Sequence, residues 1–413
     1  MGKTRKIRKA TYLNNFKCIG GSCEDNCCIG WSVEIDKKTF AKYKNLKDQE
    51  LNKLVKRYVY MNEDCYDPNV DYGLVELKKN KHCPFLNESK LCKIQVKSGE
   101  SYLSNVCVTY PRIANEINGV TEYSATVSCP EAARLILGMK EGLHFKDDEE
   151  DLNIRNILSI SVDLTRNDGI YSGKCLFELR EFTIFVLQSR KFFLWERILI
   201  LGLCLQNVQE KFDNNKEEEI PDLLNYLENK INRNEFKNET EILPANQYHQ
   251  FEILKGLSDK YNNPDEIDSA EYLSFINEFN KGITKRTNNA KKTLDLSYQE
   301  SYMKYYRPFM NKNEYLLENY LVNYVFQSLF PVAENNSVFC AFENLVIRYS
   351  MIKFFLTGIG EFRSGLTETL VIKFIQSFSK ALEHNYSFFE KIGEYMKNNK
   401  YNTIEVMSVL VKN

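Results

Sequence analysis

Residues 314–331 read Glu314-Tyr315-Leu316-Leu317-Glu318-Asn319-Tyr320-Leu321-Val322-Asn323-Tyr324-Val325-Phe326-Gln327-Ser328-Leu329-Phe330-Pro331. Apolar side chains recur four residues apart in two neighbouring rows, Leu316-Tyr320-Tyr324 and Leu317-Leu321-Val325-Leu329. Two such rows form one apolar face of an α-helix. The pattern ends at Phe330-Pro331, because proline cannot continue a helix. The stretch therefore predicts a helix over 314–329 that buries one face.

Apolar helical patterns continue on both sides of this stretch, at 177–187, 192–205, 338–357, 366–383 and 387–397. Polar stretches at 213–219 and 228–241 are expected to be loops. Residues 1–145 differ, because turn signals alternate there with cysteines, and an acidic run follows at 147–151 that we interpret as a solvated linker or a helix start. The sequence predicts a mostly α protein: an irregular cysteine-rich metal-binding module over 1–145 on a larger all-helical body over 146–413.

The composition is that of a soluble globular chain, with 413 residues, 43% apolar residues and 27% charged residues. The formal charge of −1 removes net positive charge as an argument for a nucleic-acid partner. The apolar run from Ile198 to Leu205 is far shorter than the roughly 18–20 residues needed to cross a bilayer, so no membrane insertion is expected. The basic N-terminus lacks the apolar core of a secretory leader, and we expect a cytoplasmic protein.

Cysteine is the most informative residue type, because nine of the twelve cysteines fall within the first 129 residues. Clustered thiols in a reducing compartment are metal ligands more often than disulfides. Cys65 stands apart and is expected to be structural, and some of the others could be small buried hydrophobic residues. The predicted metal ligands are Cys18, Cys23, Cys27, Cys28, Cys83, Cys92, Cys107 and Cys129.

The thiol set suits zinc or an iron–sulfur cluster, because soft ligands select both. Zinc sites usually show two closely spaced pairs, whereas these spacings are wide and eight thiols exceed what one zinc ion needs. Cys83 and Cys129 each precede proline, a step that recurs at iron–sulfur ligands and favours that alternative. The radical S-adenosylmethionine spacing C-x3-C-x2-C is incomplete, because Gly30 occupies the third cysteine's position after Cys23 and Cys27.

Several motifs together resemble the bacterial flagellin lysine-N-methylases. They are Cys18…Cys23…Cys27-Cys28-Ile29-Gly30-Trp31, Cys83-Pro84-Phe85-Leu86, Leu91-Cys92-Lys93-Ile94, Leu103-Ser104…Cys107…Tyr110-Pro111-Arg112, Ser128-Cys129-Pro130-Glu131-Ala132-Ala133-Arg134-Leu135, and the segment 315–331 quoted above. The resemblance covers nearly the whole chain. The N-terminal part alone is also similar to a broader family of zinc- or iron-chelating cysteine-cluster domains.

The resemblance implies methyl transfer from S-adenosylmethionine to lysine side chains of flagellin by an enzyme that carries an iron–sulfur cluster, [4Fe–4S] in form. Zinc stays open as the alternative metal. The rival interpretation is a non-enzymatic zinc- or iron-binding interaction protein with a helical partner-binding body.

Lysine methylation needs a neutral amine, because free lysine has a pKa near 10.4, and aromatic walls attract cations and exclude water. The aromatic cluster Tyr302, Tyr305, Tyr306 and Phe309 offers such walls, with Tyr305 and Tyr306 as candidate catalytic residues. Simple packing is the alternative for this cluster.

Tyr110 and Arg112 are further catalytic candidates, because they follow Cys107 by three and five residues. Arg112 is expected to bind the donor's carboxylate through a bidentate pair, or otherwise to brace its loop. Glu318, Asn319 and Asn323 are candidate donor-binding residues, with helix–helix hydrogen bonding as their alternative. We expect the donor site between the cysteine module and the helical body, since pockets favour domain interfaces.

Overall fold

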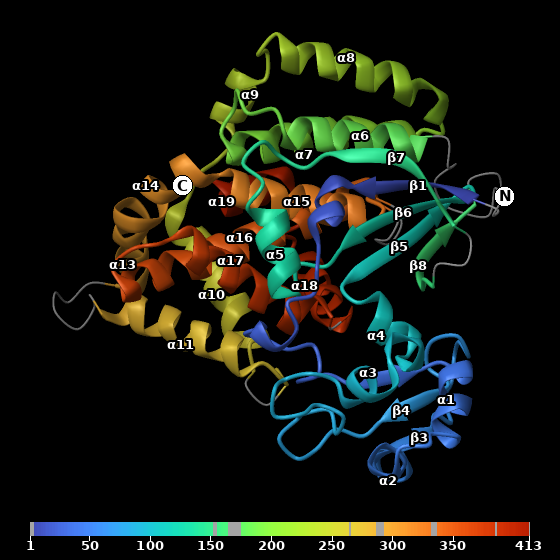
Figure 1. The fold of residues 1–413 in the computed structure, drawn as a ribbon. Helices are drawn as coiled ribbons and strands as arrows, with labels where there is room; N and C mark the ends of the chain where they lie inside the picture. The colour runs from blue at the N-terminus through green and yellow to red at the C-terminus, as the bar shows by residue number, and fades with distance from the viewer. Residues whose placement is uncertain are drawn as a thin grey trace. The chain divides into compact units, whose positions relative to one another are not determined.

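The structure is a computed structural model that describes residues 4–151, 155–163, 175–263, 266–285, 293–331, 337–384 and 386–412. The chain divides into two compact units (Figure 1). The first, called here the N-terminal unit, comprises Met1–Leu135 and His144–Val162. The second, the helical unit, comprises Ile136–Leu143 and Asp163–Asn413. This division interleaves the two segments that were predicted as 1–145 and 146–413.

A five-stranded sheet, with strand order β7-β1-β6-β5-β8, organises one part of the N-terminal unit. β1 pairs in parallel with β6, and β5 with β8, while the other two pairings are antiparallel. β5 and β6 form a hairpin closed by Asn118-Gly119, whose positive φ angles of 50° and 77° are those of a tight hairpin turn. The strands are β1 Thr4–Ala10, β5 Arg112–Ile117, β6 Val120–Ala125, β7 Phe145–Asp151 and β8 Leu158–Val162.

The acidic run at 147–151 belongs to strand β7, so its interpretation as a linker or helix start is wrong. β7 pairs antiparallel with the basic strand β1 along its whole length. Arg5 lies 2.5 Å from Glu150, and Lys9 lies 2.7 Å from Asp148. Opposite charges on neighbouring strands stabilise pairing, and this tertiary partner is what a local reading of the acidic run misses.

A three-stranded sheet, β2-β4-β3, organises the other part of the unit. Its core buries Leu51, Cys83, Phe85 and Ile94, with Cys28 and other half-buried residues packed against it. The module is therefore less irregular than predicted. The remaining elements of the N-terminal unit are β2 Val33–Ile35, β3 Val59–Met61, β4 Gly73–Val75, η1 Thr11–Asn15, η2 Gly20–Ser22, η3 Glu100–Tyr102, α1 Lys37–Lys44, α2 Gln49–Tyr58, α3 Lys93–Ser98, α4 Asn105–Thr109 and α5 Pro130–Leu137, whose last two residues belong to the helical unit.

The helical unit is built around α16, Val338–Arg363, in which every residue from Leu345 to Glu361 is buried. A helix that is apolar all round lies in a protein core. It packs closely on α11, Ala270–Lys285, because a Cβ on Gly282 would lie only 2.0 Å from the carbonyl oxygen of Gly358.

The mostly α prediction is confirmed, and the helix expected at 314–329 is α15, Tyr315–Gln327. The stretch 228–241 is not simply a loop: Leu227 and Ile231, four residues apart, are buried in α8, and α9 follows. α6 and α7 pack side by side (Figure 1). The remaining helices are α6 Leu176–Leu187, α7 Leu194–Asp213, η5 Glu217–Glu219, α8 Ile220–Asn232, α9 Lys237–Ile242, α10 Gln247–Tyr261, α13 Leu294–Ser301, η6 Tyr302–Tyr306, α14 Arg307–Asn313, α17 Glu368–Phe378, η7 Ser379–Glu383, α18 Tyr386–Asn398 and α19 Ile404–Val411.

Within the described ranges, none of the helices combines the length and apolar character required to span a bilayer.

Candidate functional sites: a thiol cluster and an aromatic pocket

Seven of the eight predicted metal ligands share one neighbourhood of the N-terminal unit. Cys28 is hydrogen-bonded to Cys27 and Cys83 and interacts electrostatically with Cys107. Cys107 interacts in the same way with Cys92 and Cys27, and Cys129 with Cys23 and Cys27. The eighth, Cys18, is an exposed thiol. We call the seven the thiol cluster: Cys23, Cys27, Cys28, Cys83, Cys92, Cys107 and Cys129.

Desolvation is the main cause that raises the pKa of four thiols of this cluster, Cys23, Cys92, Cys107 and Cys129. It raises the pKa of Cys107 to about 12, although part of that side chain is exposed. Cys129 directly precedes Pro130, the first residue of α5. Burial raises its pKa to about 11 and outweighs the backbone N–H groups of Ala132 and Glu131, which lower it. The start of this helix therefore favours the thiolate of Cys129, but desolvation has the larger effect on its pKa.

The donor chemistry of the thiol cluster fits a soft, thiolate-bound metal. In the part of the chain that the structure describes, however, no three or more His, Cys, Asp or Glu side chains are arranged to hold a metal ion. The metal site therefore stays a prediction, with the thiol cluster as its pool of ligands.

Tyr110 borders the thiol cluster, as its spacing from Cys107 predicted. Its ring packs edge-on against Trp31 at 5.4 Å between centroids, and Trp31 donates a hydrogen bond of 2.6 Å to the carbonyl oxygen of Cys27. Burial, followed by the nearby Cys129, raises the pKa of Tyr110 well above its usual value. Arg112 is exposed and lies over the ring of Phe16 at 5.1 Å. Its donor-binding role stays a prediction.

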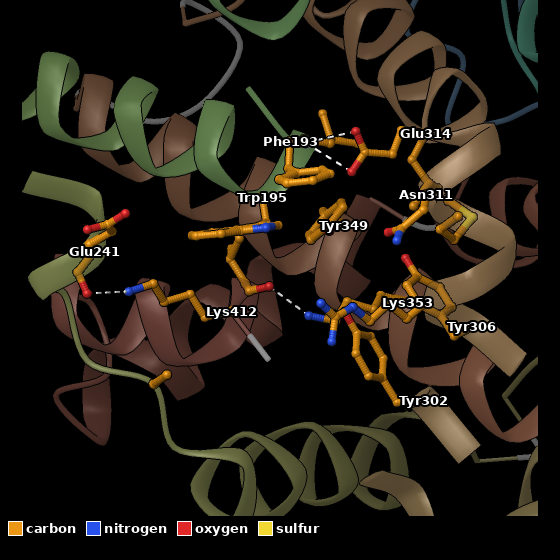
Figure 2. Close-up of a pocket in the computed structure, with 16 residues that line it drawn as sticks. Phe193, Trp195, Glu241, Tyr302, Tyr306, Asn311, Glu314, Tyr349, Lys353 and Lys412 are labelled. Carbon is orange, nitrogen blue, oxygen red and sulfur yellow. Dashed lines mark hydrogen bonds between the residues drawn. The ribbon is translucent and has the colours of Figure 1, made fainter. Parts of the chain in front are cut away.

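A pocket of about 430 Å³ lies within the helical unit (Figure 2). That volume is in the range of small-molecule sites. Five of its lining residues are aromatic: Phe193, Trp195, Tyr302, Tyr306 and Tyr349. Five are acidic or basic: Glu241, Arg307, Glu314, Lys353 and Lys412. The others are Leu194, Ala245, Met310, Asn311, Leu317 and Val411.

A π-helical turn, η6, supplies two of the aromatic walls. The rings of Tyr302 and Tyr306 stack with their centroids 5.3 Å apart and their planes 24° apart. π-Helical turns are rare and occur frequently at functional sites. Burial raises the pKa of Tyr302 to about 12, so its phenol is neutral at physiological pH. The aromatic faces therefore offer a cation the attraction of ring quadrupoles.

Burial shifts the pKa of two lysines and one carboxylate in the lining of the pocket. Lys353, fully buried in α16, donates a hydrogen bond of 2.6 Å to the carbonyl oxygen of Val411. Burial lowers its pKa to about 7. Lys412 donates to the carbonyl oxygens of Glu241 and Leu243, and burial lowers its pKa too. Burial is also the main reason that the pKa of Glu314 is raised.

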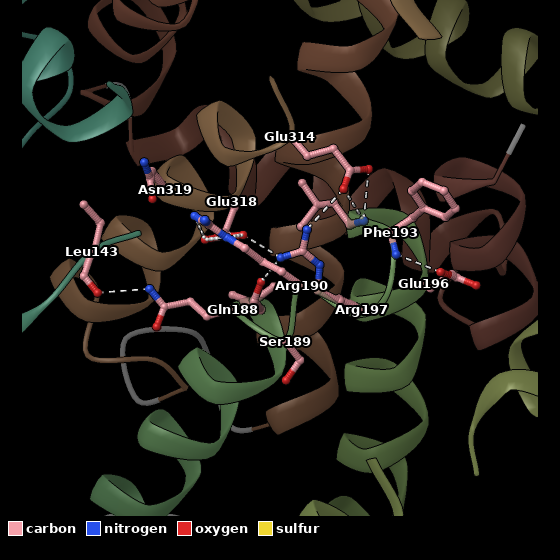
Figure 3. A network of polar contacts seen from close by, with 12 residues as sticks. Leu143, Gln188, Ser189, Arg190, Phe193, Glu196, Arg197, Glu314, Glu318 and Asn319 are labelled. Carbon is pink, nitrogen blue, oxygen red and sulfur yellow. Dashed lines mark hydrogen bonds and ion pairs between the residues drawn. The ribbon is translucent and has the colours of Figure 1, made fainter. Parts of the chain in front are cut away.

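An ion-pair network centred on the buried Arg197 and Glu318 holds Glu314 at the pocket wall (Figure 3). Arg197 lies 3.3 Å from Glu314 and 2.6 Å from Glu318, and Arg190 lies 2.8 Å from Glu318. Glu314 also accepts the backbone N–H of Leu194 at the start of α7. The network thus links α15 to α7 and orients one carboxylate toward the pocket.

The candidate donor-binding residues on α15 are placed in internal contacts. Glu318 is buried between Arg190 and Arg197. Asn319 donates hydrogen bonds to the carbonyl oxygens of Leu137 and Met139, and Asn323 contacts Gln327. None of the three lines the pocket described above. These contacts favour the helix–helix alternative, and the donor-binding role stays a prediction.

The two aromatic candidates, Tyr305 and Tyr306, have different surroundings in the structure. Tyr306 lines the pocket together with Tyr302, whereas Tyr305 packs toward Gly360 of α16 and lies beneath Lys304. Sequence reasoning did not select Trp195, Tyr349, Lys353 or Lys412. One signal was present: Lys353 is a lone lysine inside the apolar run of α16.

The fold and pocket define an all-helical unit that encloses a pocket with aromatic and charged walls. Residues 180–410, more than half of the chain, match the family described as the FliB lysine N-methylase C-terminal domain. The chain therefore belongs to this family.

Three curated relatives are similar over 132 residues at 29% identity, which is 32% of this chain. Two are lysine-N-methylases, from Salmonella choleraesuis and Salmonella typhimurium, and the third is the flagellar biosynthetic protein FliU of Salmonella muenchen. The match spans about a third of the length of the two lysine-N-methylases and 76% of FliU. No solved structure matches the chain.

Proposed function

We propose that this protein is a protein-lysine N-methyltransferase that transfers methyl groups from S-adenosylmethionine to lysine side chains of flagellin. The observation that carries the proposal is the family match over 180–410, because this range contains nearly all of the pocket lining. The printed names of the relatives, lysine-N-methylase and a flagellar biosynthetic protein, support the reaction and the substrate class.

The pocket suits the two reactants of such a transfer, because both carry a cationic group: a sulfonium on the donor and an ammonium on the acceptor. Trp195, Tyr302, Tyr306 and Tyr349 offer aromatic faces to a cation. Glu314 adds a carboxylate held in place by Arg197. Few water molecules fit beside a ligand in such a space, which strengthens these electrostatic contacts.

We further propose that the N-terminal unit binds an iron–sulfur cluster through thiolates of the thiol cluster. A bound cluster would cross-link segments around residues 27, 83, 107 and 129 and so stabilise the fold of this unit. The transfer itself requires no radical, since a neutral amine is already a nucleophile. The cytoplasmic location expected from the sequence stays a prediction.

The test is incubation of the anaerobically purified protein with labelled S-adenosylmethionine and flagellin of the same organism. We expect label in flagellin and mass increases in steps of about 14 Da at surface lysines. Flagellin whose lysines have been chemically blocked is the matched control and should take up no label. Absence of label from unmodified flagellin, with the protein folded and its metal intact, would refute the proposed activity.

Metal and sulfide analysis of the same preparation tests the cluster separately. We expect a brown protein with about four iron and four sulfide per chain. A colourless protein with stoichiometric zinc would replace the iron–sulfur proposal with the zinc alternative and leave the methylation result to stand by itself.

A further inference from the structure

Lys353 is the most unusual ionisable group in the pocket. Its side chain is 1% exposed, and its amine lies 5.5 Å from the ring centre of Tyr302 and 5.9 Å from that of Tyr349 (Figure 2). Among the described residues, its amine makes one hydrogen bond, to the carbonyl oxygen of Val411. A neutral amine in this place has a second N–H and a lone pair that this hydrogen bond does not use.

No carboxylate of the described residues forms an ion pair with Lys353. Glu314, on the pocket wall, is instead paired with Arg197 and accepts the N–H of Leu194. The charged and titratable groups around Lys353 are Tyr349 on its own helix, Tyr302 and Tyr306 on η6, Arg307 on α14, Glu314 before α15, Glu241 on α9 and Lys412 after α19. Burial without a counter-ion disfavours the ammonium form, and it lowers the pKa of Lys353 to about 7.

Lys412, the other lysine of the pocket, is arranged differently. Its amine donates hydrogen bonds of 3.1 and 2.7 Å to the carbonyl oxygens of Glu241 and Leu243. It also lies 5.7 Å from the ring centre of Trp195. Two carbonyl acceptors favour a donating amine, so Lys412 anchors the end of α19 to α9 and the residue that follows it.

We propose that Lys353 is the proton acceptor that converts the ammonium group of the target lysine into a nucleophilic amine within this pocket. The inference rests on the proposed methyltransferase function and deepens it. A proton passes from the target nitrogen to Nζ of Lys353. The lone pair left on the target nitrogen forms the new N–CH3 bond as the S–CH3 bond of the donor breaks, and the sulfonium leaves as a neutral thioether. Lys353 then releases its proton to water.

The charge balance of the pocket supports this direction of transfer. A target ammonium has a pKa near 10.4 in water, but the same desolvation that acts on Lys353 lowers it inside the pocket. Two amines that share a small, dry space behave as one coupled system and hold one proton more readily than two. The stacked rings of Tyr302 and Tyr306 can stabilise that single positive charge on either nitrogen.

Glu314 is the rival proton acceptor, because its carboxylate lines the same pocket. Its oxygens are already engaged by Arg197 and by the N–H of Leu194. These contacts lower the pKa of Glu314 against the larger effect of burial, and they occupy the oxygens that would accept a proton.

The experiment compares three pocket variants with a control in the flagellin assay, as kcat and KM against pH. Lys353→Met keeps the apolar stem and removes the amine, while Lys353→Arg keeps a donor for Val411 but stays protonated at every accessible pH. Glu314→Gln removes the rival base. Lys312→Met, at an exposed position of α14, is the control. Thermal unfolding of each variant checks that it is folded.

We expect the wild-type kcat to rise with pH through an apparent pKa near that of Lys353, about 7, and then level off. Both Lys353 variants should lose about 10²–10⁴-fold in kcat with KM changed much less, and the plateau should disappear. Glu314→Gln should mainly raise KM and keep the ionisation near 7. Wild-type kinetics without that ionisation, or its loss in Glu314→Gln alone, would overturn the role of Lys353.

A second measurement tests the protonation of Lys353 independently of methyltransferase activity. Competitive acetylation by trace acetic anhydride, read by mass spectrometry across pH, reports directly when each lysine is neutral. Lys353 should become reactive near pH 7, some three pH units below the value near 10.4 of a free lysine. A wild-type protein that does not methylate flagellin refutes the function. An active wild-type whose Lys353 variants keep the normal pH profile refutes the proton acceptor alone.

Discussion

Burial shifts pKa values in opposite directions in the thiol cluster and in the aromatic pocket. In the N-terminal unit, burial raises the pKa of thiols such as Cys107 and Cys129 and keeps them neutral. In the helical unit, burial lowers the pKa of Lys353 and also keeps that group neutral. A neutral thiol must lose its proton before it binds metal, whereas a neutral amine is already competent as a base.

The same desolvation therefore makes one region dependent on an added ion and the other ready for proton transfer. The two regions also differ in how their sequence is arranged. The thiol cluster comes from residues 23 to 129, while the pocket draws on residues between 193 and 412. The variants described next test whether burial has these different consequences in the two regions.

The largest effect is expected from removing a thiol of the cluster. Cys83→Ser or Cys129→Ser should lower metal content and soluble yield together, because metal binding and folding are coupled in such modules. Cys83 also belongs to the buried core beside Phe85. Cys65→Ser, at a half-buried cysteine outside the cluster, is the control and should keep its metal. Full metal content in both cluster variants would show that these thiols only pack the core.

A smaller effect, on the free energy of unfolding, is expected when Glu318 of the helical unit is changed to Ala. This leaves Arg197 buried without one of its carboxylates and should cost about 3–5 kcal/mol of unfolding free energy. Glu368→Ala removes the partner of Lys140 in an exposed ion pair and should cost less than about 1 kcal/mol. Denaturant titration measures both. Equal small losses would mean that the network around Glu314 is not what holds the pocket wall.

Burial also shifts the pKa of a carboxyl group in α16, that of Glu343. Desolvation raises its pKa from 4.5 to about 7, and one of its oxygens, Oε1, has no hydrogen-bond partner. A raised folded-state pKa means that the folded protein binds the extra proton, so this contribution to stability is present below pH 4.5 and is lost as the pH rises through 7.

Glu343→Gln should therefore remove a pH dependence on the order of 3 kcal/mol and be the more stable protein at pH 8. Thermal or urea unfolding at pH 5 and pH 8 measures the change. Glu228→Gln, at an exposed position of α8, should unfold with the same pH dependence as wild type. A Glu343 variant that follows wild type at both pH values would contradict the shift.

The smallest effect is expected from Arg112→Lys, which keeps the charge but loses the guanidinium fork. Arg112 is exposed and lies over Phe16, so we expect donor affinity to fall by less than about tenfold. Binding of labelled S-adenosylmethionine to this variant and to Trp195→Ala compares the two regions directly. A larger loss in Arg112→Lys than in Trp195→Ala would assign the donor's carboxylate to the N-terminal unit, as the sequence analysis proposed.

Sequence reasoning succeeded where the signal was local and failed where a distant segment completed the structure. α15 was predicted within a few residues, because rows of apolar residues four apart encode a buried helix face. The acidic strand β7 was missed, because its basic partner β1 lies at the other end of the unit's sequence. Tyr306 was selected, but its function as a pocket wall depends on Tyr349 and Trp195, which no pattern connected to it.

The sequence by itself determined the helical body, the position of its buried faces and the concentration of thiols near the N-terminus. Each of these follows from periodicity or composition, which are properties of neighbouring residues. Only the tertiary structure decided that Lys353 is buried in an aromatic pocket and that Glu318 is paired with two arginines. Desolvation and ion pairing depend on which atoms surround a group in space, and those atoms come from segments far apart in the chain.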